Sequence, residues 1–355
     1  MNREVHVQFC GKVAVKFRCV TRLPAIANIM ANQIIDELGF KFMEGKDVKG
    51  RLSISDLYPK SKSRCGIYLL SFNDDTYYIG QALDFVRRFS QHRKTYDNIR
   101  NCWFQPIKKI NLDDVEKRLI QSAELNGLLL INKVYISNII GETDLDLVIS
   151  PKEQEDWLIN GLSISDEGID LYNSVEPRHI LKYRNNFQRF LNVPNYQEIK
   201  NFLKSYILKC IPCFKKTELS FWSLSCLSST NANTSPRYIC LNINGMEVLV
   251  IGYNKKTKTP FCFIVVTQSW AKKNTDINNL KKRYKGMEYI DGNYRTAGLD
   301  QITLHFNSLE DLQDLINTQL TIVQSIKEMN MRLMRKGGTI FSVNHCFDLA
   351  HDVLS

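Results

Sequence analysis

Five residues in the first third of the chain have side chains suited to phosphate chemistry. Two tripeptides, Gly66-Ile67-Tyr68 and Tyr78-Ile79-Gly80, each contribute a phenol. Arg88 follows the second tripeptide by eight residues, and His92 lies one helical turn further on. Glu116 opens a later apolar and basic stretch. Neither tripeptide means much alone, so the prediction depends on their pairing and on the spacing of the later residues.

Hydrolysis of a phosphodiester needs three things that this set could supply. These are a deprotonated nucleophile, neutralisation of the charge that grows on the phosphoryl oxygens, and a cation near the leaving oxygen. The guanidinium of Arg88 is a permanently charged fork that suits a phosphate oxygen. The carboxylate of Glu116 is a hard oxygen ligand, and Mg²⁺ takes its remaining ligands from water and substrate phosphate. One protein carboxylate is therefore sufficient.

Together these residues resemble the signature of the GIY-YIG nucleases. The resemblance implies a metal-dependent DNA endonuclease that uses Mg²⁺, with Mn²⁺ as an alternative. It makes Tyr68 the candidate general base that activates water, while Tyr78 assists it or positions the phosphate. Arg88 matches the family's helix arginine, His92 matches a frequent histidine partner, and Glu116 matches the metal-binding glutamate.

The resemblance extends over about residues 64–135, roughly a fifth of the chain. The family also tends to carry an asparagine after the glutamate helix. Asn126 and Asn132 both qualify here, and Asn132, which has the better spacing, completes the predicted catalytic set.

Each assignment competes with a simpler interpretation. Asp113 and Asp114 stand where acidic residues commonly stabilise the start of a helix, so Glu116 is the preferred metal ligand, with Glu124 as a further rival. Arg88 could instead form an ion pair with Asp84 one turn earlier, worth about 0.3–0.5 kcal/mol. The neighbouring Arg87 is disfavoured only by its spacing, and His92 could be an ordinary surface histidine.

The tyrosines need a particular environment to act as bases. A phenol has an unperturbed pKa of about 10, so a nearby cation, a metal-bound water or His92 must lower the pKa of Tyr68. Tyr77, next to Tyr78, should point to the opposite face of its strand and pack there.

The elements that position these residues follow from the local patterns. An apolar strand at 66–72, a turn at Asn73-Asp74-Asp75 and a strand at 76–80 predict a hairpin. Helical patterns follow at about 82–96 and 113–125. Tyr68 and Tyr78 would then lie on adjacent strands, where side chains on one face can converge.

The whole chain is predicted to be α+β, with four parts. An N-terminal α+β cap covers 1–60, with strands within 4–18 and a helix at about 24–38 closed by Gly39. The nuclease domain, a small antiparallel sheet flanked by helices, covers 61–140, and a helical connector, acidic and then basic, covers 141–216. A C-terminal α+β domain covers 217–355, for substrate recognition or dimerisation.

The C-terminal domain is predicted from a change in the spacing of apolar residues, from a helical period to the alternation that is typical of strands. Strands are expected at about 237–244, 247–253, 261–267 and 302–306, followed by a helix that Ser308 caps. The stretch 317–336 has apolar residues at helical spacing and is expected to be a core or dimer helix.

A net charge of +10 and a sequence pI near 9.0 favour a polyanionic partner. The stretch 141–170 is acidic, and is either a solvated linker or a segment that competes with DNA for a basic groove. Lysines and arginines interleave with aromatic residues near the C-terminus, which suits phosphate contact and base stacking or a plain solvated face. The predicted nucleic-acid contacts are Lys62, Arg64, Arg87, Arg93, Lys94, Arg178, Lys182, Lys281, Lys282 and Arg283.

The cysteines and the chain start favour a reducing compartment. Ten cysteines are scattered, mostly within apolar runs, and suggest buried free thiols. Cys210 and Cys213 have the spacing of half a zinc site, which Cys226 and Cys240 could complete, but buried thiols are favoured. No signal peptide and no apolar stretch of about 18–20 residues is visible, so a cytoplasmic protein without a membrane span is expected.

The sequence thus predicts a DNA endonuclease, for restriction, phage defence, a mobile element or repair. One site would cut one strand, so double-strand cleavage needs a homodimer or sequential nicking. Two alternatives stay open: an RNA or branched-DNA nuclease with the same chemistry, and a nucleic-acid-binding protein with an inactive nuclease fold. The complete set of catalytic residue types disfavours the second.

Overall fold

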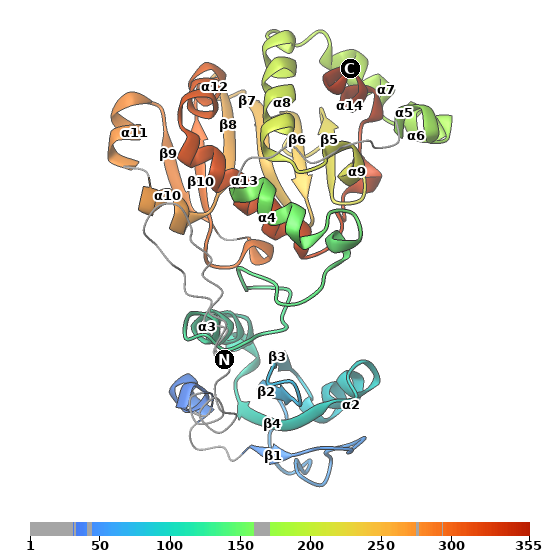
Figure 1. The fold of residues 1–355 in the computed structure, drawn as a ribbon, viewed down its shortest axis with the longest axis vertical. Coiled ribbons are helices and arrows are strands. Elements are labelled where there is room, and N and C mark those ends of the chain that lie inside the picture. The colour runs from blue at the N-terminus through green and yellow to red at the C-terminus, as the bar shows by residue number, and fades with distance from the viewer. Residues whose placement is uncertain (1–30, 32, 41–44, 160–170, 275–276, 293) are drawn as a thin grey trace, which may run out of the picture. The chain divides into compact units, whose positions relative to one another are not determined.

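The computed structural model describes residues 31, 33–40, 45–159, 171–274, 277–292 and 294–355 (Figure 1). The chain divides into two compact units, Met1–Ile131 and Asn132–Ser355. Each unit contains helices and one antiparallel sheet, so the α+β class is confirmed. The four-part division of the chain stays a prediction.

The first unit is built on a four-stranded sheet in the order β1-β4-β2-β3. Its strands are β1 (Lys46–Asp47), β2 (Gly66–Phe72), β3 (Tyr77–Ala82) and β4 (Ile99–Pro106). The predicted hairpin is confirmed as β2 and β3. The sequence patterns did not predict β4, which pairs with β2 along its whole length.

The β2–β3 turn is formed by residues that tolerate its backbone. Asp75 adopts a left-handed conformation with φ 58°, which aspartate tolerates better than most residues. The Asp74 carboxylate accepts hydrogen bonds from the Thr76 hydroxyl at 2.7 Å and from the Thr76 N–H at 3.3 Å. The turn sets a register in which Tyr68 lies opposite Gly80, which places Tyr68 and Tyr78 on one face of the hairpin.

Two helices follow the strands. Helix α2 (Phe85–Thr95) begins after Asp84, whose side chain accepts from the Arg87 N–H at 3.2 Å. Its Phe85 and Phe89 pack in one buried cluster with Tyr68. Helix α3 (Leu112–Leu125) follows the short turn η2 (Lys109–Asn111) and contacts β3 and β2.

Because side chains alternate between the two faces of the sheet, its strands can pack against both α2 and α3. Tyr68 and Leu70 face the α2 cluster, while Ile67, Leu69 and Ile79 alternate with them and are fully buried. A strand buried on both faces reads as a continuous apolar run, as β2 does.

The predicted N-terminal strands within 4–18 and most of the predicted helix at 24–38 lie outside the described residues. Its end is described as the π-helical segment η1 (Asp36–Phe40), in which Gly39 has a non-helical φ of 89°. That left-handed conformation explains why a glycine closes the helix.

The second unit has a six-stranded antiparallel sheet in the order β5-β6-β7-β8-β10-β9. Its strands are β5 (Trp222–Cys226), β6 (Arg237–Ile243), β7 (Met246–Asn254), β8 (Thr259–Val266), β9 (Glu288–Asp291) and β10 (Ile302–Phe306). The four strands predicted here are confirmed, with ends shifted by up to two residues. Strands β5 and β9 were not predicted.

One face of this sheet is covered by helices α8 (Tyr196–Cys210), α12 (Leu309–Thr318) and α13 (Leu320–Arg335) (Figure 1). Helix α13 (Leu320–Arg335) buries Ile322, Ile326 and Met329 in the unit's core, which confirms the core interpretation of the stretch 317–336. Ser308 caps α12 (Leu309–Thr318) by accepting from the Asp311 N–H, as predicted.

The predicted helical connector is helical in its described part. Its elements are η3 (Asp144–Leu147), α4 (Pro151–Ile159), α5 (Leu171–Ser174), α6 (Pro177–Leu181), α7 (Arg184–Phe190), α8 (Tyr196–Cys210) and α9 (Phe214–Thr217). The remaining elements of the second unit are α10 (Gln268–Asn274), α11 (Ile277–Arg283), η4 (Arg295–Ala297), η5 (Ser342–Asn344) and α14 (Phe347–Leu354).

Each described cysteine except the partly exposed Cys65 is buried, which agrees with the expected internal thiols. Within the described ranges no helix combines the length and apolar character required to cross a membrane.

Candidate active site

The predicted tyrosine, histidine and arginine meet at the α2 face of the hairpin. The Tyr68 hydroxyl oxygen lies 2.7 Å from His92 Nε2, and Arg88 donates from Nε to the same oxygen at 3.3 Å. The Tyr78 ring stacks on Tyr68 with its centroid 6.1 Å away, and it lies 4.9 Å from the His92 ring. Asp84 does not take Arg88 as its partner, because it caps α2 and lies 3.7 Å from Arg64.

The Tyr68 hydroxyl takes part in two hydrogen bonds, one with Arg88 and one with His92. A guanidinium can only donate, so the Tyr68 oxygen accepts from Arg88, and the Tyr68 hydrogen is available to a His92 Nε2 that carries no proton. Burial, and then the charge of Arg88, lowers the pKa of His92 to about 4. His92 is therefore neutral at pH 7, and its Nε2 can accept the hydrogen bond.

The pKa of Tyr68 moves away from the value that a base at neutral pH needs. Burial raises it well above its ordinary value and Tyr78 adds to this, while Arg88 opposes the shift. Tyr68 exposes none of its surface, whereas Arg88 is exposed. In this structure Tyr68 is thus a protonated hydroxyl held between His92 and Arg88. A general base at neutral pH would need a lowered Tyr68 pKa, and in this structure that pKa is raised instead.

The His92 environment predicts a specific pH dependence of stability. Because the folded pKa of about 4 lies below the unfolded value of 6.5, the unfolded chain binds the extra proton first as the pH falls. The contribution of neutral His92 to the free energy of unfolding is therefore fully present above pH 6.5. It is lost as the pH falls toward 4, by about 3 kcal/mol. We expect His92→Gln to remove this loss, measured as the difference in unfolding free energy between the two proteins across pH 4–8. Above pH 7 the difference should be constant, and parallel curves throughout would contradict the assignment.

Gly80 leaves the space that the Tyr68 ring occupies. A β-carbon at position 80 would lie 2.6 Å from Cζ of Tyr68 and 2.8 Å from a ring carbon of Tyr78. Real side chains do not approach so closely, so the final glycine of the second tripeptide has a steric reason.

Glu116 is held by the residue that follows this glycine. Its Oε1 accepts the Gln81 backbone N–H at 3.1 Å, and its Oε2 accepts the Gln81 side-chain amide at 2.9 Å. The same amide donates to Asp113 at 2.6 Å. The negative charge of Glu116 also contributes to the raised pKa values of both Tyr68 and Tyr78.

The residues present fit an Mg²⁺ ion that the substrate helps to bind. The described chain contains no group of three or more acidic, histidine or cysteine side chains able to enclose a metal. Glu116 nevertheless offers two hard carboxylate oxygens beside β3, and it is only partly buried. Mg²⁺ usually binds through one or two carboxylates and keeps several waters, so this donor set is adequate.

Three further predictions concern neighbouring residues. Tyr77 is buried and its carbonyl accepts from the Ile131 N–H at 2.9 Å, which agrees with a packing role. Asn126 follows α3 and its amide donates to the Ser122 carbonyl at 2.9 Å. Asn132 is buried and begins the second unit, so its place in the catalytic set stays a prediction.

The predicted nucleic-acid contacts in the first unit have two kinds of environment. Lys62, Arg87 and Lys94 are exposed. Arg64 donates to the Tyr58 carbonyl at 2.8 Å. Arg93 donates to the backbone carbonyls of Val48, Arg51 and Asp97. These bonds give Arg64 and Arg93 a role in holding the fold.

Those in the second unit also have local partners. Arg178 pairs with Glu176 at 2.6 Å, and Arg283 pairs with Asp314 at 2.7 Å. Lys182 donates to the Val343 carbonyl at 2.8 Å. The Lys281 ammonium lies 4.2 Å from the Tyr289 ring centroid, and Lys282 is exposed.

The described part of the acidic stretch 141–170 has an internal role. Asp146 accepts from Gln154 at 2.7 Å and lies 3.5 Å from Arg335. Thr143 and Asp146 form a capping box at η3. Residues 160–170 lie outside the described residues.

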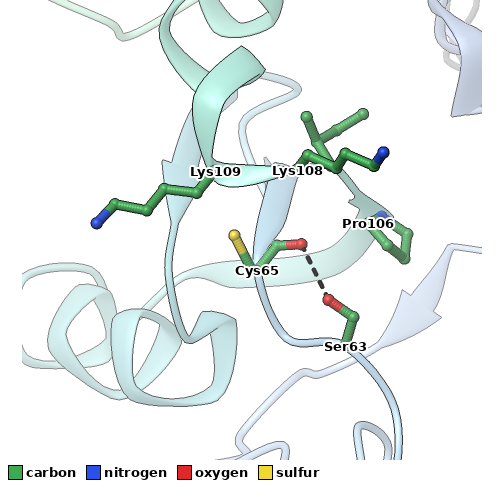
Figure 2. A pocket seen from close by; sticks show the side chains of 6 residues that line it. Ser63, Cys65, Pro106, Lys108 and Lys109 are labelled. Carbon is green, nitrogen blue, oxygen red and sulfur yellow. Dashed lines mark hydrogen bonds between the residues drawn. The ribbon is translucent and has the colours of Figure 1, made fainter.

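A pocket of about 360 Å³ opens near the start of α3 (Figure 2). Its lining is Ser63, Cys65, Pro106, Ile107, Lys108 and Lys109. None of the six predicted catalytic residues lines it, and Figure 2 shows the two lysine side chains extending in opposite directions. The lining of the pocket therefore does not include the site formed by Tyr68, His92 and Arg88, and the two lysines do not converge on one point.

Sequence reasoning missed Gln81 and the involvement of Asp113. The position of Gln81 directly after Tyr78-Ile79-Gly80 was visible, but the contact with Glu116 required knowledge of how α3 packs on β3. Comparisons with protein-family models, curated proteins and solved structures find no match to this chain.

Proposed function

We propose that the first unit is the catalytic part of a metal-dependent endonuclease of the GIY-YIG type that hydrolyses DNA phosphodiesters. The observation that carries this proposal is the meeting of His92 and Arg88 on the Tyr68 hydroxyl, at 2.7 and 3.3 Å. Glu116, on helix α3, is hydrogen-bonded to Gln81 of β3, the strand that pairs with the Tyr68 strand β2. The basic net charge of +10 favours a polyanionic substrate.

Arg88 would bind the phosphate and release Tyr68 at the same time. In the free protein the Arg88 Nε–H occupies an acceptor position of the Tyr68 oxygen. When a phosphate oxygen takes the guanidinium, that position becomes able to accept a hydrogen bond from the attacking water. The guanidinium then neutralises charge on the phosphoryl oxygens.

His92 would take the proton that Tyr68 gives up. Since the raised pKa of Tyr68 disfavours a resting phenolate, the water proton moves to the Tyr68 oxygen as the Tyr68 proton moves to His92 Nε2. The phosphate offsets the Arg88 charge that otherwise disfavours imidazolium. Glu116 would hold Mg²⁺, which supplies charge stabilisation near the leaving oxygen.

The test is cleavage of supercoiled plasmid by the full chain with Mg²⁺ or with EDTA, beside Tyr68→Phe purified in the same way. We expect nicking only with Mg²⁺, and a loss of about 10²-fold in Tyr68→Phe because the relay is broken while the buried ring is kept. Equal rates for the two proteins would indicate a contaminant or a wrong base. Linear product appearing after nicked circles would indicate sequential cuts.

The substrate class has two further outcomes. Cleavage of RNA or branched DNA but not of plasmid would keep the chemistry and change the substrate. Binding of DNA without cleavage of any substrate would favour an inactive nuclease fold. The restriction, phage-defence, mobile-element and repair settings, a cytoplasmic location and a homodimer remain part of this proposal.

A further inference from the structure

Gln81 forms hydrogen bonds to two acidic side chains, Glu116 and Asp113, and it has no role in the mechanism proposed above. Its backbone N–H and its side-chain amide bind different oxygens of one carboxylate, at 3.1 and 2.9 Å. The same amide nitrogen reaches Asp113 at 2.6 Å. A primary amide has two N–H donors, so one side chain can serve both acids.

These bonds fix the carboxylate of Glu116 in two ways. The main-chain bond comes from β3, the strand that also carries Tyr78, so it ties Glu116 to the hairpin that positions the tyrosines. The side-chain bond fixes the rotation of the carboxyl group. It also places hydrogen-bond donors between two acids, Asp113 and Glu116, that would otherwise repel each other.

We propose that Gln81 is a positioning residue that orients Glu116 for a divalent cation and keeps Asp113 out of the ligand set. This inference rests on the proposed function, in which Glu116 is the cation ligand. Groups that hydrogen-bond a metal ligand from outside typically change metal affinity 10–100-fold when they are removed. Because the main-chain N–H of position 81 remains when only the side chain is shortened or made apolar, we expect the lower end of that range.

The test is direct Mn²⁺ binding by the full chain, followed by the loss of the free-ion electron paramagnetic resonance signal. Gln81→Leu removes both side-chain donors and keeps a similar volume, and Gln81→Ala serves if the leucine variant does not fold. The matched control is Gln105→Leu, because Gln81 and Gln105 both lie opposite Ile67, on β3 and β4. Glu116→Gln reports the ligand itself, and circular dichroism checks the folding of every variant.

We expect Glu116→Gln to abolish one Mn²⁺ site, Gln81→Leu to weaken that site about 10-fold, and Gln105→Leu to leave it unchanged. Unchanged binding in Gln81→Leu, with loss in Glu116→Gln, would overturn the positioning role and leave the proposed function standing. Unchanged binding in Glu116→Gln would overturn both. Equal weakening in Gln81→Leu and Gln105→Leu would overturn the specific role of Gln81.

Discussion

Glu116→Gln should reduce plasmid cleavage by about 10⁴-fold, because the variant loses the charged oxygen that we propose as the cation ligand. Glutamine has nearly the same shape, so the packing of α3 on the sheet should persist. The measurement is the initial rate of nicking across a range of Mg²⁺ concentrations. Added Mg²⁺ should not restore the rate, because the ligand itself is changed.

Asp114→Asn is the matched control for this substitution. Asp114 lies two residues earlier in the same helix, is exposed, and loses the same charge. Its rate should stay within a few-fold of the wild type, because its expected role is the helix N-terminus. If Asp114→Asn fell as far as Glu116→Gln, a general change of charge would explain both results.

Arg88→Ala should reduce the rate of the chemical step by about 10³-fold, through loss of the charge that meets the phosphoryl oxygens. The measurement is single-turnover cleavage with the protein in excess. A second readout follows from the geometry. The Arg88 charge helps to lower the pKa of His92, so in Arg88→Ala the pKa of His92 should rise.

Arg87→Ala is the control for Arg88. The two arginines are adjacent on α2 and both exposed, but Arg88 is the one whose Nε donates to Tyr68. We expect Arg87→Ala to raise KM with little change in kcat, as a phosphate contact outside the transition state would. A loss of kcat in Arg87→Ala, with Arg88→Ala unaffected, would contradict the selection of Arg88 over Arg87 as the catalytic arginine.

The hairpin and the two helices that carry the site could be predicted because their signals are local. The turn at Asn73–Asp75 sits between two apolar runs, and an aspartate caps the helix that carries Arg88. Once those elements are fixed, the convergence of Tyr68 and His92 follows from strand pairing and helical spacing.

The remainder depended on contacts between distant segments. Strand β4, which reads Ile-Arg-Asn-Cys-Trp-Phe-Gln-Pro, lacks regular alternation, and its pairing with β2 is what makes it a strand. The raised pKa of Tyr68 arises from burial under α2, which the local sequence does not reveal. The bond from Gln81 to Glu116 spans 35 positions in the chain and depends on the packing of α3.

Strand β3 carries three residues of the proposed site, Tyr78, Gly80 and Gln81, within four successive positions. Tyr78 and the space at Gly80 belong to one face, and Gln81 belongs to the other. Side chains alternate along a strand, so a slip of one residue in its pairing with β2 would exchange the two faces. Such a chain could keep its apolar content and its helices. The Tyr78 and Gln81 side chains would then lie on the wrong faces, and the space at Gly80 would no longer lie beside Tyr68. The turn at Asn73–Asp75 takes no part in the proposed chemistry, but it fixes the register that aligns the proposed catalytic residues.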